Sequence, residues 1–109
     1  MYTSISMDGT IEKYFPSSIV RRQVRFAEIC NDTGVFAKVF ERKLPTIELR
    51  IDLILAKFYA DNFESASITA KAGKRAWLRL VLSGQIDEAT VIGLIFQANK
   101  LGSQKLDIE

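Results

Sequence analysis

Histidine is absent from this 109-residue sequence, and cysteine occurs once, at Cys30. Without histidine the chain lacks the usual general base of neutral pH, the imidazole of Ser-His-Asp and Cys-His catalysis, and a common zinc ligand. A lone cysteine forms no internal disulfide, which is typical of a chain from a reducing compartment. Its apolar neighbours predict a buried Cys30 rather than a reactive thiol. We therefore expect no enzyme, no cofactor and no metal site.

Long apolar runs are also missing, since none approaches the roughly 20 residues that span a bilayer. No N-terminal stretch pairs positive charge with a long apolar segment, so we expect a cytoplasmic protein without a membrane role. Neither sign of charge dominates, because 15 basic and 13 acidic residues leave a net charge of +2. With 48% hydrophobic and 26% charged residues, the composition is that of a globular domain with one core.

Start and stop signals along the chain predict an all-α fold, a compact bundle of about five short helices with a small N-terminal arm or hairpin. The arm covers residues 1–16, where Asp8-Gly9 can form a hairpin turn, and Pro16 closes it. A single helical domain is expected over residues 17–102, followed by a C-terminal tail over residues 103–109. The expected helices cover residues 18–32, 35–42, 47–60, 66–83 and 88–101, with a strand as the alternative for the second.

The segment from Ile47 to Ala60 is apolar nearly all round, which places it at the centre of the expected bundle. Glu48 and Asp52 stand four residues apart there, a spacing at which two carboxylates could share a metal ion. Carboxylate metal centres in bundles need further ligands, including histidines, that this chain does not contain. Ion pairing with nearby basic residues is therefore the favoured interpretation.

The segment "ITAKAGKRAWLRLVLSG" (68–84) contains a Gly-Lys pair but does not match a P-loop, because Ile68 and Arg75 stand where glycine and serine or threonine are needed. As a helix it would carry small and apolar residues on one side and a basic stripe on another. Gly73 would allow close helix packing. Trp77 is interpreted as a core anchor, with base stacking as the alternative.

The basic stripe is the main candidate for function. None of the 13 acidic residues falls between Ser65 and Ile86, whereas a solvated helix face normally mixes charges of both signs. Such a stripe can follow a phosphate backbone, and three arginines of the first expected helix would extend it. The candidate nucleic-acid-binding residues are Lys71, Lys74, Arg75, Arg79, Arg21, Arg22 and Arg25.

The leading hypothesis is a small helical nucleic-acid-binding protein, DNA-binding above all, with a regulatory or accessory role. A solvated face and an acidic protein partner remain alternatives for the stripe. The other hypothesis is a helical protein-interaction module or homo-oligomer without a nucleic-acid role, because the central and last segments carry more apolar residues than one monomer readily hides. The seven phenylalanines are spread along the chain, a distribution that predicts core filling rather than a stacking platform.

Overall fold

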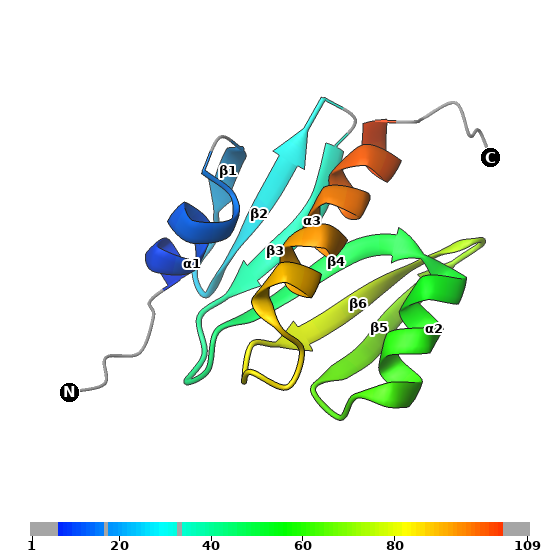
Figure 1. The fold of residues 1–109 in the computed structure, drawn as a ribbon. Helices are drawn as coiled ribbons and strands as arrows, with labels where there is room; N and C mark the ends of the chain where they lie inside the picture. Colours follow the sequence, from blue (N-terminus) through cyan, green and yellow to red (C-terminus); the bar gives the residue numbers. More distant parts are fainter. Residues whose placement is uncertain (1–6, 17, 33, 104–109) are drawn as a thin grey trace.

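Buried and partly exposed residues alternate along several stretches of this chain, and these stretches form strands. The computed structural model describes residues 7–16, 18–32 and 34–103, which form one six-stranded antiparallel sheet and three helices (Figure 1). The strands are β1 (Ile19–Arg22), β2 (Phe26–Asn31), β3 (Gly34–Phe40), β4 (Thr46–Asp52), β5 (Ala66–Ala72) and β6 (Arg75–Val81). The helices are α1 (Met7–Tyr14), α2 (Leu53–Asn62) and α3 (Glu88–Ser103).

The sheet has the strand order β1-β2-β3-β4-β6-β5, so β1 and β5 are its edges. Consecutive strands pair as hairpins from β1 to β4, and β5 pairs with β6. The chain leaves β4 through α2 and returns in the edge strand β5, which places β6 between β4 and β5. Two bulges interrupt the register, one where β2 meets β3 and one within β5.

The three helices lie on one face of this sheet (Figure 1), and the core is between the two layers. α3 packs on β2, β3 and β4, whereas α2 packs on β4, β5 and β6. Strand residues that point toward the helices are apolar and fully or almost fully buried. They include Ala27, Ile29, Val39, Ile47, Leu49, Ile51, Ala76, Leu78 and Leu80.

The expectation of an all-α bundle is wrong. Strands occupy most of the expected helices over 18–32, 35–42 and 66–83 and the first part of the one over 47–60, because in these stretches the buried residues recur at every second position rather than every third or fourth. The expected helix over 47–60 is two elements, β4 and then α2. Asp52 separates them, since its carboxylate accepts hydrogen bonds from the backbone N–H groups of Ile54 and Leu55 and so caps α2.

The N-terminal segment also differs from the expected hairpin. Asp8 and Gly9 lie within α1 rather than in a turn, and residues 1–6 lie outside the described ranges. Ile11 and Phe15 are buried, and the Phe15 ring meets the Phe36 ring edge-on at 6.2 Å between centroids. This segment therefore contributes to the core instead of extending from it as an arm.

The Gly73-Lys74 pair is the two-residue turn between β5 and β6. Gly73 has a φ of +62°, a left-handed value that glycine adopts without steric cost, and no non-glycine residue in the described chain has a positive φ. Glycine at the first central position is typical of a type II′ hairpin turn. The small residue at position 73 thus turns the chain, and the prediction that it brings two helices close together is wrong.

The last helix was predicted correctly. α3 begins at Glu88, directly after Asp87, and Val91 and Leu94 on its inner side are buried against the sheet. No helix within the described ranges is long and apolar enough to cross a membrane.

Candidate functional site

The sheet has a second face, opposite the helices, that no other element of the described chain covers; we call it the open face. In register order across five strands, it carries the row Arg21, Glu28, Lys38, Glu48 and Arg79, in which basic and acidic residues alternate. We call these five residues the charge row. Opposite charges on neighbouring strands attract, so the row supports the strand register.

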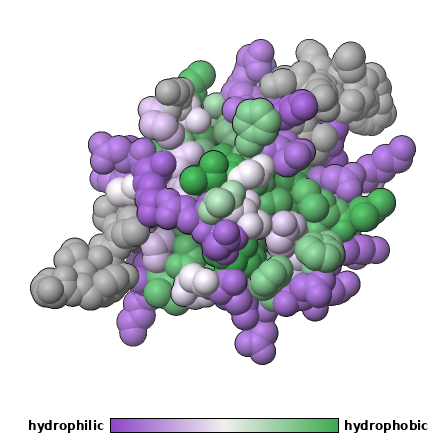
Figure 2. Space-filling view, in the orientation of Figure 1, coloured by the Kyte–Doolittle hydropathy of each residue, from purple (hydrophilic) through white to green (hydrophobic). Residues whose placement is uncertain are grey.

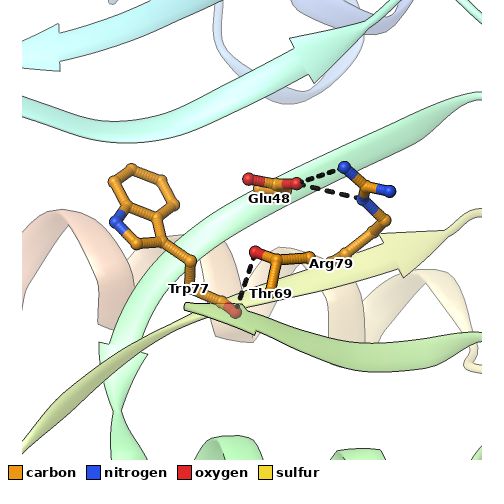
Figure 3. Close-up of polar contacts among 4 residues, drawn as sticks. All are labelled: Glu48, Thr69, Trp77 and Arg79. Carbon is orange, nitrogen blue, oxygen red and sulfur yellow. Dashed lines mark hydrogen bonds and ion pairs between the residues drawn. The ribbon is translucent and has the colours of Figure 1, made fainter. Parts of the chain in front are cut away.

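Two ion pairs neutralise part of the charge row. Arg79 donates hydrogen bonds from Nε and Nη2 to one Glu48 carboxylate oxygen, at 3.0 and 2.7 Å, as Figure 3 shows. Arg21 donates to Glu28 at 2.9 Å. Glu48 is 5% exposed although it lies on the open face, because its neighbours close over it.

Aromatic rings lie among these charges. The Phe26 and Phe40 rings stack with their centroids 5.6 Å apart, and the Arg79 guanidinium lies 5.3 Å from the Phe40 ring centroid. The Lys38 ammonium lies 4.8 Å from the centroid of the Trp77 ring. Trp77 is half-buried on the open face and is not part of the core, so its predicted role as a core anchor is wrong.

Arg50 is the register partner of Trp77 on β4. Its Nε is buried and has no hydrogen-bond partner within the described ranges. Burial, and then the neighbouring Arg75 guanidinium, lower the pKa of Arg50, although an arginine remains protonated at neutral pH. Two guanidiniums thus lie near each other at this corner of the open face, where Asp52 is the register partner of Arg75.

The predicted binding residues do not lie along one helix. Arg21, Arg75 and Arg79 are on the open face. Arg22 points to the other face, where it pairs with Asp8 of α1. Arg25 lies between β1 and β2, whereas Lys71 lies on the edge strand β5 and Lys74 lies in the β5–β6 turn, near the opposite edge of the sheet. The two predicted groups therefore lie toward opposite edges of the sheet, although Arg21 and Arg79 share the open face, and they do not form one continuous basic helix surface.

Sequence reasoning missed Lys38, Arg50, Phe26 and Phe40 as parts of this surface. Alternation was the available signal: Lys38 stands between buried Ala37 and Val39, and Arg50 stands between two other buried residues of β4. Only Phe15 and Phe36 among the phenylalanines are buried in the core, so the prediction of core filling holds for a minority of them.

The remaining candidate groups have structural tasks. Glu48 binds Arg79 and Asp52 caps α2, and among the described residues no cluster of three potential metal ligands exists. Cys30 is partly exposed on the open face rather than buried. A cavity of about 220 Å³ lies on the helix side, between Tyr14, Pro45 and Val91, where Lys13 and Glu88 form an ion pair of 3.3 Å at its rim.

Comparison with known proteins supports the architecture alone. No protein-family model matches the sequence, and no curated protein matches it either. The fold is similar to that of a protein from Pseudomonas syringae whose crystal structure comes from a structural genomics consortium, with a TM-score of 0.63 and 14% sequence identity. The match covers 88% of this chain and 94% of that one. At this identity the likeness shows a shared fold.

Proposed function

We propose that this protein binds nucleic acid, and that phosphates contact the open face of the sheet. One observation carries the proposal: each acid of the strands is engaged, whereas basic groups remain on an uncovered surface. Glu28 and Glu48 pair with arginines of the charge row, and Asp52 caps α2. Within the described ranges, Lys38 and Arg50 form no ion pair.

The distribution of charge between the layers favours the same surface. The six strands carry seven basic and three acidic residues, five of the basic ones on the open face, whereas the three helices carry three basic and four acidic ones. A net charge of +2 conceals this asymmetry. Because a polyanion responds to the local field and not to the net charge of the chain, it is attracted to the sheet side.

Salt dependence tests the proposal. We expect a labelled mixed-sequence oligonucleotide, followed by fluorescence anisotropy at several salt concentrations, to bind more weakly as salt rises. The double variant Lys38→Gln/Arg50→Gln should bind more weakly, with a log–log salt slope reduced by about 0.7 per lost phosphate contact on single strands and about 0.9 on duplex. Arg50 Nε has no hydrogen-bond partner in the described chain, so this change removes no bond from that atom.

A matched control is Lys57→Gln/Lys100→Gln, which removes the same charge from exposed positions on α2 and α3. Equal weakening by both variants would show a general charge effect and contradict the assignment to the open face. An affinity for the oligonucleotide that does not change with salt concentration would contradict the proposal itself. Competition with polyglutamate distinguishes nucleic acid from an acidic protein partner. If polyglutamate displaces the labelled oligonucleotide as effectively as unlabelled nucleic acid does, an acidic protein partner is indicated instead.

A second candidate function is self-association through the helix side. Four large apolar side chains are exposed there, Ile54 (78%) and Phe58 (55%) on α2 and Ile92 (50%) and Phe96 (65%) on α3. Figure 2, which views this side, shows hydrophobic atoms among hydrophilic ones over both helices. Each pair stands four residues apart, so each helix offers an apolar strip that an identical strip in a second copy could cover.

Sedimentation equilibrium tests this candidate. We expect Phe58→Ser/Phe96→Ser to shift a dimer toward the monomer, because each change exposes less apolar surface and weakens the contact. Val24→Ser is the matched control, since Val24 is 91% exposed in the β1–β2 turn. A wild-type protein that stays monomeric at high concentration would exclude self-association without affecting the nucleic-acid proposal.

A further inference from the structure

Trp77 is held on the open face between two basic side chains. It lies on β6, between β4 and the edge strand β5, and the Thr69 hydroxyl donates to its backbone carbonyl at 3.4 Å. Lys38 from β3 reaches its ring, and Arg50 faces it in register from β4. Figure 3 shows the indole and the Arg79 guanidinium extending to either side of Glu48. An aromatic surface is thus placed among groups that attract phosphate.

Phe40 provides a second ring at a defined offset from Trp77. It pairs with Thr46, which lies four residues before Arg50 on β4. The two rings are therefore attached about 13 Å apart along the strands and two strands apart, or about 10 Å, across the sheet. Arg79 lies against Phe40, and Arg42 also lies 5.7 Å from its ring centroid. On the diagonal from Phe40 to Trp77, the middle position on β4 is Glu48, which is paired with Arg79, and the basic residues Lys38 and Arg79 lie to either side of it.

The geometry of this diagonal suits unpaired bases. An aromatic side chain stacks on a base whose face is free, and basic groups beside it hold the phosphates that follow. In a duplex the base faces are covered by their neighbours, and recognition uses an element that enters a groove. The helices all lie on the other side of the sheet, so no helix of the described chain projects from the open face.

From this arrangement we infer that the ligand is single-stranded nucleic acid, with a base stacked on Trp77 and the adjoining phosphates held by Lys38 and Arg50. This inference rests on the proposed function and narrows its ligand. Phe40 offers a second stacking position further along the same strand of nucleic acid. Sequence preference is weak in this mode, because every base has a π face.

The test compares a labelled 12-nucleotide single strand with its own duplex by anisotropy, using wild-type protein, Trp77→Leu and Trp77→Phe. We expect the wild type to prefer the single strand at least about tenfold. Trp77→Leu should weaken single-strand binding about five- to a hundredfold, the range that loss of one stacked base implies. Trp77→Phe keeps an aromatic ring and should retain most of the affinity.

Phe96→Leu is the matched control, because Phe96 is exposed on the helix side and the change also removes one aromatic ring. Circular dichroism and thermal melting establish that each variant is folded. If Trp77→Leu does not fold, comparison of the wild type with Trp77→Phe still tests the role of the ring. Trp77 is the sole tryptophan of the chain, so quenching of intrinsic fluorescence by unlabelled single strand reports stacking in the wild type directly.

The outcomes separate this inference from the function on which it rests. Equal, salt-sensitive affinity for single strand and duplex would overturn the stacking assignment and leave nucleic-acid binding intact. The inference would also be overturned if Trp77→Leu binds the single strand with the same affinity as Phe96→Leu. Absence of binding to both nucleic acids at low salt would overturn the proposed function and the inference together.

Discussion

Leu49→Ala is expected to lower the free energy of unfolding by about 3–4 kcal/mol. Leu49 is fully buried on β4, between Ala37 and Leu78 in the register, where α3 covers the sheet. It lies between β3 and β6 and under α3, so its neighbours cannot all move inward to fill the space that the shorter side chain leaves. The variant loses both the transfer free energy of the removed atoms and the contacts around the cavity.

A domain of this size has a total stability of about 5–15 kcal/mol, so this loss should lower the thermal midpoint by about 15 °C. Urea unfolding followed by circular dichroism measures the change. Leu44→Ala is the matched control, because Leu44 is 45% exposed in the β3–β4 connection and should cost about 1 kcal/mol or less. Equal losses in the two variants would contradict the placement of the core between β4 and α3.

The segment around Leu49 also shows why the fold class was mispredicted. Ile47, Leu49 and Ile51 face the helices, whereas Glu48 and Arg50 face outward, so the period of two is present in the sequence. Taken together with α2, however, these residues appear apolar on all sides, which favours a buried helix. Propensity is a weak guide here, because pairing with β3 and β6 stabilises the strand and those partners are distant in the sequence.

α3 was predictable because its signals are local. An acidic residue before its first turn and apolar residues at helical spacing lie within one continuous segment, and tertiary packing agrees with them. The β5–β6 hairpin carries a local signal as well, since Gly-Lys between two alternating stretches is consistent with a two-residue turn. Because a helix was expected over 66–83, the Gly-Lys pair was not interpreted as a turn.

The candidate site depends on pairing that spacing alone does not reveal. Phe26 and Phe40 are fourteen residues apart in the sequence, yet the β2–β3 register makes them direct partners. Lys38 reaches Trp77 across β4. Clusters of this kind follow from strand order, which spacing along the chain does not show. Sequence reasoning therefore identified the basic residues of β6 but not Lys38, Phe26 and Phe40 on the other strands.

The pairing of Glu48 with Arg79 leads to the second large effect. Arg79→Met should lower the free energy of unfolding by about 3 kcal/mol, because it leaves a buried carboxylate without its two charge-assisted hydrogen bonds. The side chain of Glu48 is only 7% exposed, whereas that of Arg79 is 28% exposed. Glu48→Leu should therefore cost less than Arg79→Met, since the guanidinium left behind can turn toward water.

A double-mutant cycle isolates the interaction from the individual changes. Glu48→Leu/Arg79→Met removes both charges and places apolar side chains beside Phe40, so we expect its stability to be close to that of the wild type. Urea unfolding of the four proteins measures the coupling, and losses that simply add would show that the pair contributes no such interaction. Because Glu48 already neutralises Arg79, the double variant should also keep the salt slope of nucleic-acid binding. Arg79 would then hold the strands in register while Lys38 and Arg50 contact the ligand.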